Sequence, residues 1–372
     1  MRPATIAVRA GRQPDPATGA IAEPIHLSTT FLRHEDGSFP GGYIYSREKA
    51  PNRTSLETAL AALDGGADAA AFSSGLASTT ALFQALRPGD HVICAREVYY
   101  GTKKLLAQVF ANWGLQHSIV DTTDVPAVRA AMQAATVLIW AETPSNPTVS
   151  VSDIEALAAV AHAGGARLAV DNTWGTPIGQ RVLDAGADLA MYSTTKYFGG
   201  HSDVLSGALV TRQSDDLWGR IRMLQSTTGA VPSAFDAWLV HRGISSLACR
   251  FQQHCASAAT VASGLEGHAG VEAVHYPGLA SHPGHAIARK QMRLFGGMIS
   301  IQVRGGAEDA MRVAARLRLF TRATSLGGTE SLVEHRKSIE GPDSPTADNL
   351  LRLSIGLEDP EDLLDDLRHA LA

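Results

Sequence analysis

Short apolar runs alternate with longer amphipathic segments along residues 59–232. The apolar runs end in turn residues and predict strands at 67–75, 91–97, 135–142, 167–172, 188–195 and 207–211. Segments with helical spacing follow several of these runs, at 76–90, 99–113 and 151–165. The run 135–142 is almost entirely apolar, as a buried central strand of a parallel sheet is. This repeated order predicts an α/β fold with a doubly wound, mostly parallel sheet.

The two ends of the chain have different patterns. Residues 1–58 lack strong periodicity, are rich in Gly, Pro, Ser and Thr, and are too long for an ordinary loop inside a compact domain. They are either disordered or packed on another surface, and their scattered aromatic and apolar residues favour packing. From residue 233 a long helical pattern precedes mixed strand and helix patterns. We therefore predict an arm at 1–58 that contacts a neighbouring subunit, a large domain at 59–232 and a smaller C-terminal α+β domain at 233–372.

Composition narrows the class of protein. The 372 residues are 45% hydrophobic and 19% charged, which is ordinary for a soluble globular enzyme. The net charge of −5 and the lack of a long basic run argue against a nucleic-acid partner. No apolar run approaches the ~18 residues of a membrane span. The three cysteines show no CxxC spacing, so we expect no metal site, a reducing compartment and a cytoplasmic location.

Polar residues follow the apolar part of four of the predicted strands. In an open α/β sheet, ligands bind beyond the carboxyl ends of the strands. The residues found there are a glycine turn that opens a helix, a turn amide, a carboxylate, and hydroxyls beside a lysine, namely Ser73, Ser74, Gly75, Asn146, Asp171, Ser193, Thr195 and Lys196. These positions predict one binding site at the edge of the sheet.

The groups at this edge together suit a phosphorylated aromatic aldehyde. Lys196 would form a Schiff base with it, and Asp171 would pair with a protonated pyridine nitrogen. The phosphate would be held by a helix N-terminus and two hydroxyls, namely by Gly75, Leu76, Ser193 and Thr195.

Each of these residues also has an ordinary interpretation. A single lysine is usually a surface residue, and an aspartate after a strand is often a helix cap. Their joint placement favours the site. No Gly-x-Gly-x-x-Gly and no Gly-x-x-x-x-Gly-Lys-Ser/Thr loop follows a strand, so a nicotinamide-dependent oxidoreductase lacks its fingerprint. A catalytically silent binding protein is a further alternative. The presence of Lys196, Asp171, Tyr99 and Arg352 together argues against it.

Eight motifs resemble, in order, those of the pyridoxal-phosphate (PLP) enzymes of cysteine and methionine metabolism. They are "YSREKAPNRTSLE", "FSSGLAS", "VYYGT", "ETPSNPT", "AVDNTW", "STTKYFGGHSD", "SLGGTESL" and "LLRLSIGLED". The resemblance extends from about Thr5 to Leu371. It implies the type I aminotransferase-like fold, PLP as cofactor, an amino-acid substrate and a homotetramer of two dimers with shared active sites.

The resemblance also implies roles for single residues around the cofactor. Lys196 is the Schiff-base lysine and the mobile base, and Asp171 is the pyridinium partner. Tyr99 stacks on the cofactor ring and takes part in catalysis. Asn146 lies near the phenolic oxygen of the ring and contacts the substrate.

Further roles concern the substrate and the neighbouring subunit. Arg352 binds the substrate carboxylate, a task that suits a planar bidentate cation, and Ser325 and Thr324 lie beside the substrate. Tyr45 and Arg47 match residues that reach the phosphate in the neighbouring subunit.

Three departures from the family pattern concern specificity. Gly101 stands where methionine γ-lyases carry a cysteine, which argues against that activity. Thr324 stands where cystathionine γ-synthases and γ-lyases carry a glutamate. The segment containing residues 334–337 replaces a stretch with Thr-His-Ala, and it either changes substrate contacts or forms a solvated loop with a charged face.

The reaction predicted first is γ-replacement of the cystathionine γ-synthase type, from an O-acylhomoserine and cysteine. A cystathionine or homocysteine γ-lyase that releases 2-oxobutanoate and ammonia is the alternative, and an O-acylhomoserine sulfhydrylase is a third. A specialised γ-replacement or γ-elimination in secondary metabolism is also open, given Thr324.

Overall fold

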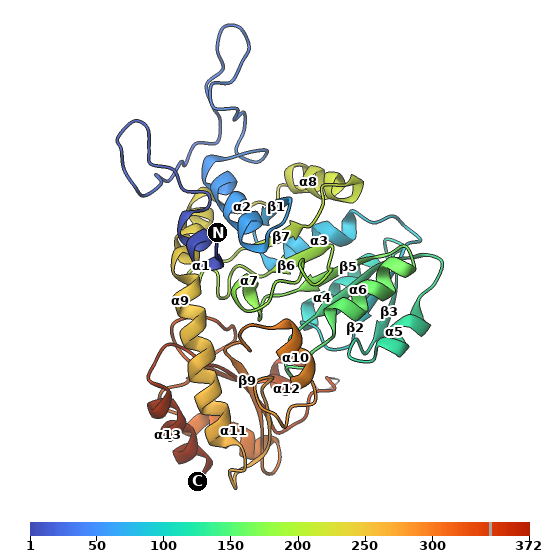
Figure 1. The fold of residues 1–372 in the computed structure, drawn as a ribbon, viewed down its shortest axis with the longest axis vertical. Coiled ribbons are helices and arrows are strands. Elements are labelled where there is room, and N and C mark those ends of the chain that lie inside the picture. Colours follow the sequence, from blue (N-terminus) through green and yellow to red (C-terminus); the bar gives the residue numbers. More distant parts are fainter. Residues whose placement is uncertain (342–343) are drawn as a thin grey trace.

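The computed structural model describes residues 1–341 and 344–372. It has two sheets joined along one long helix, α9 (Ala234–Leu265), which runs beside both of them (Figure 1). At about 1.5 Å per residue, the 32 residues of α9 span about 48 Å. Among the described residues, no helix is both long enough and apolar enough to cross a membrane.

The large sheet has the strand order β1-β7-β6-β5-β4-β2-β3. Its strands are β1 (Asp68–Phe72), β2 (His91–Ala95), β3 (Gln116–Val120), β4 (Thr136–Glu142), β5 (Arg167–Asp171), β6 (Leu189–Tyr192) and β7 (Gly207–Thr211). Strand β7 pairs antiparallel with β1 and with β6, whereas the pairs between β6 and β3 are parallel. The predicted fold class, with its mostly parallel sheet, is confirmed.

Helices cover both faces of the large sheet, because its buried strands carry apolar side chains on both sides. In β4, Ile139 belongs to one core cluster and Trp140 to the other. The first cluster also contains residues of α2 (Pro51–Asp64), α5 (Val125–Ala131), α6 (Ile154–Ala163), α7 (Thr176–Gly179) and α9. The second contains residues of α3 (Gly75–Gln84), η1 (Leu105–Phe110) and α8 (Asp216–Thr228). This is the two-sided covering of a doubly wound sheet.

The smaller sheet has the order β10-β11-β12-β9-β8. Its strands are β8 (Val271–His275), β9 (Met298–Val303), β10 (Thr321–Arg322), β11 (Leu332–His335) and β12 (Leu350–Ser354). A separate core cluster joins this sheet to the C-terminal half of α9, α11 (Ala307–Arg316) and α13 (Pro360–Leu371). Helices α10 (His285–Gln291) and α12 (Arg336–Glu340) complete the part of this unit that the structure describes.

The structure differs from the prediction for one helix and one strand of the large domain. The helix predicted over 99–113 is a short α-helix, α4 (Tyr100–Lys104), followed by the π-helical η1. Strand β3 was not predicted, because it is a partly exposed edge strand with the mixed sequence QHSIV, which lacks the apolar run of a central strand.

The N-terminal region combines two helices with a long irregular stretch. Helix α1 (Pro3–Arg9) and helix α2 both pack against α9. Between them the chain forms the two loops that project from the body at the top of Figure 1. Side chains in this stretch are exposed although apolar, among them Ile21 at 86% and Leu27 at 78%. The predicted contact of residues 1–58 with a neighbouring subunit, and the boundaries at 58 and 232, stay predictions.

Candidate active site

A cavity of about 410 Å³ lies where strand ends of the large sheet meet the smaller sheet. Eleven predicted site residues line it, namely Gly75, Leu76, Tyr99, Asn146, Asp171, Ser193, Thr195, Lys196, Thr324, Ser325 and Arg352. Tyr45 and Arg47 are not in that lining and are exposed on the N-terminal stretch. The Arg47 guanidinium lies 5.7 Å from the centre of the Tyr45 ring and donates to the carbonyl oxygen of Ser226.

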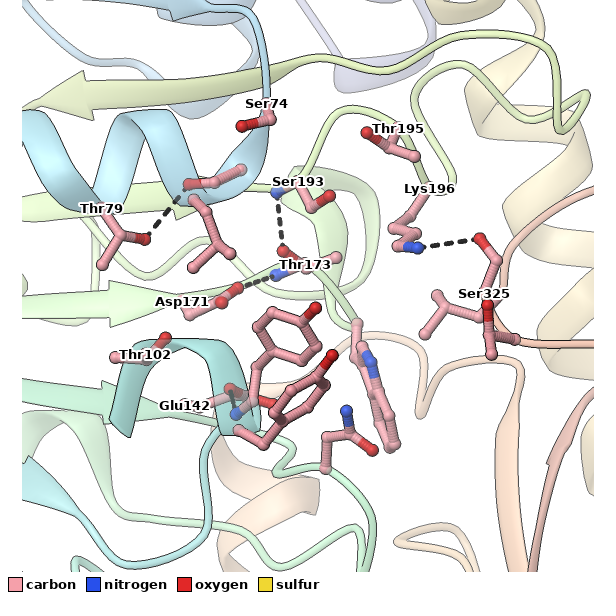
Figure 2. Close-up of a pocket in the computed structure, with 18 of the residues that line it drawn as sticks. Ser74, Thr79, Thr102, Glu142, Asp171, Thr173, Ser193, Thr195, Lys196 and Ser325 are labelled. Atoms are coloured by element: carbon pink, nitrogen blue, oxygen red, sulfur yellow. Dashed lines mark hydrogen bonds between the residues drawn. The ribbon is translucent and has the colours of Figure 1, made fainter. Parts of the chain in front are cut away.

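Lys196 lies in the loop after β6 and reaches across the cavity. Its Nζ donates a hydrogen bond of 2.8 Å to Oγ of Ser325, which comes from the opposite wall (Figure 2). Burial, aided by the positive charge of Arg352, lowers the pKa of Lys196 to about 8. Because a neutral amine is the nucleophilic and basic form, a useful fraction of Lys196 is reactive near neutral pH.

Ser325 is held in an unusual backbone conformation. Its φ is +93°, in a region that non-glycine residues rarely adopt and that is often found at functional sites. Its carbonyl oxygen accepts from the Arg352 guanidinium at 3.0 Å while its hydroxyl accepts from Lys196. Ser325 thus joins the lysine to the arginine.

Asp171 ends β5 on the same edge of the sheet. Its Oδ1 accepts from the backbone N–H of Thr173 at 3.0 Å, and Oγ1 of Thr173 in turn accepts from the backbone N–H of Ser193 at 2.9 Å (Figure 2). Burial raises the pKa of Asp171 to about 6, although the hydrogen bonds from Thr173 oppose this rise. A cation placed against this carboxylate would keep it ionised.

The turn after β1 opens helix α3 with an arrangement suited to an anion. Oγ of Ser74 caps the helix by accepting from the N–H of Ala77 at 3.1 Å, and the N–H groups of Gly75 and Leu76 belong to the first turn, which has no intrahelical acceptor. A Cβ on Gly75 would lie 3.0 Å from Cβ of Ser193. Glycine therefore lets the helix start approach the loop that carries Ser193.

The lining of the cavity includes a carboxylate that the sequence analysis did not single out. Glu142 ends β4 opposite Asp171 in the register of β4 and β5. Its Oε2 accepts from the backbone N–H of Tyr99 at 2.7 Å. Burial and the neighbouring Asp171 raise the pKa of Glu142 well above its usual range. The strand-end position that identified Asp171 identifies Glu142 as well.

Tyr99 contacts both this carboxylate and Tyr100. The two tyrosine rings pack edge to face with centres 4.8 Å apart. A Cβ at Gly101 would lie 2.6 Å from Cε1 of Tyr99, so a cysteine at position 101 would require the Tyr99 ring to move. The glycine that departs from methionine γ-lyases therefore fits this orientation of Tyr99.

The wall from the smaller sheet is charged. In this wall, Oε2 of Glu334 lies 2.6 Å from Arg352 and 2.7 Å from Arg336, and Arg336 lies 2.7 Å from Glu340. The side chains of Glu334, Arg336 and Arg352 are each 3–4% exposed. The alternative of a solvated charged loop is wrong for Glu334, His335 and Arg336, because β11 and the start of α12 bury them. Residues 342 and 343 of that segment lie outside the described residues.

Arg352 has partners besides Glu334. It donates to Oδ1 of Asn146 at 3.2 Å as well as to the carbonyl of Ser325. Burial lowers the pKa of Arg352 to about 10, but the nearby Glu334 opposes this change. The cavity thus holds a reactive amine facing a buried carboxylate on one side and a buried guanidinium on the other.

Comparison with known proteins gives a consistent result. Residues 4–372 match the model of the family described as Cys/Met metabolism PLP-dependent enzyme. The chain is 48% identical over 375 residues to cystathionine gamma-synthase of Mycobacterium tuberculosis, covering 99% of this chain and 96% of that protein. It is 44% identical over 381 residues to cystathionine gamma-lyase of Mus musculus, covering 99% and 94%.

A solved structure agrees with these sequence matches. The crystal structure of metB from Corynebacterium glutamicum superposes with a TM-score of 0.97 at 42% identity, covering all of this chain and 98% of that one. The match of the family model over nearly the whole chain confirms the resemblance seen in the motifs. The chain therefore belongs to the Cys/Met metabolism PLP-dependent enzyme family.

Proposed function

We propose that this PLP-dependent enzyme catalyses γ-replacement on an O-acylhomoserine, with cysteine as the incoming thiol and cystathionine as product. The observation that carries the proposal is the partly buried Lys196, hydrogen-bonded to Ser325 in one cavity with Asp171 and Arg352. The relative from Mycobacterium tuberculosis, which carries the name cystathionine gamma-synthase, supports this choice.

The residues on the large-sheet wall fit the cofactor. PLP supplies an electron sink that makes protons beside the substrate nitrogen acidic. Asp171 would face the pyridinium nitrogen as a buried anion, and Lys196 would hold the aldehyde carbon. Tyr99 would lie against the ring face, and Asn146 would lie near the phenolic oxygen. The phosphate would be bound by the start of α3 and two hydroxyls, from Gly75, Leu76, Ser193 and Thr195.

The other wall would bind the amino acid. Arg352 would bind the α-carboxylate through its planar guanidinium, and Asn146 and Ser325 would keep that guanidinium in place through the hydrogen bonds described above. Thr324 lines the cavity beside them and would contact the side chain of the substrate.

Lys196 is the base in this arrangement. With its Nζ free, Lys196 would take the α-proton of a substrate held by Arg352 and would return a proton to the reacting atoms. Lys196 would also take a β-proton, and the γ-substituent would then leave with its bonding electrons. The incoming thiol would bond to the γ-carbon and give up its proton. If the γ-substituent left and no thiol added, hydrolysis by water would release 2-oxobutanoate and ammonia. This is the γ-elimination alternative, and the Mus musculus relative carries the name cystathionine gamma-lyase.

Product analysis by mass spectrometry tests this function. Enzyme loaded with PLP is given an O-acylhomoserine with and without cysteine. We expect cystathionine only with cysteine, in excess over 2-oxobutanoate. Dominant 2-oxobutanoate in the presence of cysteine would identify a γ-lyase instead, and the absence of both products would contradict activity on homoserine derivatives. Sulfide in place of cysteine tests the sulfhydrylase alternative.

We propose further that the enzyme is a homotetramer whose active sites are shared within dimers. Tyr45, 41% exposed, and Arg47 lie outside the cavity of their own chain. They would contact the phosphate in the neighbouring subunit, and the exposed apolar side chains of the same stretch would be covered by that contact.

Mixing two inactive variants tests the shared site. Arg47→Ala and Lys196→Ala homo-oligomers are each expected to have little activity. When they exchange subunits, one site of each mixed dimer combines an intact Lys196 with an intact Arg47. Recovery of activity on mixing supports the proposal, and no recovery between subunits shown to exchange would contradict it.

The location of the enzyme is a separate proposal. Cys94 and Cys255 are buried free thiols, and Cys249 is an exposed free thiol. Free thiols of this kind persist in a reducing compartment, which supports the cytoplasm. Cell fractionation with a periplasmic or secreted marker as control tests this assignment.

A further inference from the structure

One oxygen of Glu334 serves two guanidinium groups. Oε2 lies 2.6 Å from Arg352 and 2.7 Å from Arg336. Within residues 1–341 and 344–372, the other oxygen, Oε1, is buried and has no hydrogen-bond partner. A carboxylate normally accepts several hydrogen bonds through both oxygens, so Glu334 is incompletely satisfied.

The Glu334 carboxylate is paired with Arg352, the residue that we propose binds the α-carboxylate of the substrate. Two N–H groups of Arg352 already donate to Asn146 and to the carbonyl of Ser325. A substrate α-carboxylate that arrived while Glu334 stayed in place would put two negative charges against one buried guanidinium. Like charges at such a distance repel strongly in a poorly solvated cavity. The two carboxylates therefore compete for Arg352.

Arg336 provides Glu334 with a second partner. It lines the same cavity, and its side chain is 3% exposed. It holds Glu334 through one terminal nitrogen and Glu340 through the other, at 2.7 Å each. Since Glu334 stays paired with Arg336, it need not become an isolated buried charge when it leaves Arg352.

We propose that Glu334 is an internal competitor of the substrate α-carboxylate for Arg352, and that Arg336 is the positioning residue that holds Glu334 when the substrate takes its place. This inference rests on the proposed function, because it assigns the α-carboxylate to Arg352. If the proposal holds, residues 334 and 336 determine how tightly the enzyme binds the α-carboxylate of its amino-acid substrate.

Equilibrium binding to the PLP-loaded enzyme tests the exchange. L-2-Aminobutanoate, which has no γ-leaving group, is titrated by calorimetry, and 1-aminopropane serves as the same ligand without its carboxylate. For Glu334→Gln we expect the amino acid to bind about tenfold more tightly, at the lower end of what one charged hydrogen bond contributes. The amine should change less than about twofold, within the scatter of substitutions that touch no charge of the ligand.

Two further variants separate competition from disruption. Arg336→Gln removes the alternative partner, so it should weaken binding of the amino acid about tenfold and raise KM more than it lowers kcat. Glu334→Asp keeps the charge but shortens the side chain, so it should lie between wild type and Glu334→Gln. Glu272→Gln is the matched control, because Glu272 bonds Asn349 on another part of the smaller sheet. If Arg336→Gln does not fold, the binding measured for Glu334→Gln and Glu334→Asp still tests the competition for Arg352.

The outcomes are distinguishable. Unchanged or weaker binding of the amino acid to folded Glu334→Gln would overturn the competition, whereas wild type would still bind the ligand and form product. If wild type prefers the amine to the amino acid, the assignment of Arg352 is wrong, and the exchange is wrong with it. Equal gains for amine and amino acid would also overturn it, because the effect would then not concern the carboxylate.

Discussion

The two walls of the cavity hold their polar groups in different ways. On the large-sheet wall several polar groups are fixed by neutral backbone partners, as Asp171 is by the N–H of Thr173 and Thr195 is by the backbone of Ser206. On the smaller-sheet wall, Glu334, Arg336 and Arg352 are charges that fix one another. The first wall is a preorganised template, whereas the second contains the ion pairs for which we propose an exchange of partners.

This difference matches the two tasks of the site. A cofactor that stays bound needs groups whose positions do not change, and short hydrogen bonds to the backbone supply them at little cost in side-chain entropy. A substrate that enters and leaves in each cycle needs a binding group, here the Arg352 guanidinium, that has an anionic partner both with and without the substrate. Lys196 belongs to the first wall and contacts the second through Ser325.

The largest expected effect comes from removing the only lysine in the cavity lining of the described residues. Lys196→Ala should lower kcat by at least about 10³-fold, because general-base catalysis contributes about 10² to 10⁴ and the attachment of the cofactor is lost in addition. Steady-state rates of product formation measure this loss. Lys290→Ala is the matched control, since Lys290 is an exposed partner of Glu155. Retained activity in Lys196→Ala would contradict the role of Lys196 and would favour the alternative of a nicotinamide-dependent oxidoreductase.

The large-sheet wall was predictable from the sequence, and the other wall only in part. Apolar strands followed by Gly75, Asp171 and Lys196 identify one sheet edge, because parallel strands bring their carboxyl ends together. Glu142 could have been found in the same way, since it is the last residue of β4. Strand ends are local signals that a single sequence carries.

The ion pairs of Glu334 with Arg336 and Arg352 depend on contacts that local patterns do not encode. Glu334 meets Arg352 across the antiparallel pair β11 and β12, which puts them opposite each other in register. Neither strand β11 nor helix α12 has a strong periodic pattern, and the charges around residue 336 are equally typical of a solvated loop. Only the packing of the smaller sheet distinguishes the two interpretations.

The next effect in size concerns the charge on the smaller-sheet wall. Arg352→Leu should raise KM for the amino acid about 10- to 100-fold, because a charged hydrogen bond contributes about 1.5–3 kcal/mol. Arg352→Lys should recover part of this loss, because it restores the charge but not the planar fork. KM and kcat measured separately check this prediction, with Arg316→Leu on the far helix α11 as control. A fall in kcat with unchanged KM would show that Arg352 acts elsewhere than in substrate binding.

The smallest expected effect shows whether the two walls are coupled through Lys196. Burial first and the Arg352 cation second keep the pKa of Lys196 at about 8, while Glu334 acts in the opposite direction. Below pH 8 a growing fraction of the amine is protonated, and only the neutral fraction reacts. Its acylation rate in the apoenzyme should therefore rise about tenfold per pH unit well below pH 8 and level off above pH 8. Labelling of Lys196 by an amine-acylating reagent, quantified by peptide mass spectrometry, gives this profile.

The two charge variants should move this profile in opposite directions. Arg352→Leu removes a positive charge that disfavours the ammonium form, so the pKa of Lys196 rises and the midpoint moves to higher pH. Glu334→Gln removes a negative charge that favours the ammonium form, so the midpoint moves to lower pH. Each shift should be a few tenths of a pH unit, as roughly expected for charges that other ions already neutralise in part. Shifts in the same direction would indicate a change in burial rather than in charge. An unmoved midpoint in both variants would mean that the exchangeable ion pairs bind the substrate without setting the reactivity of the lysine.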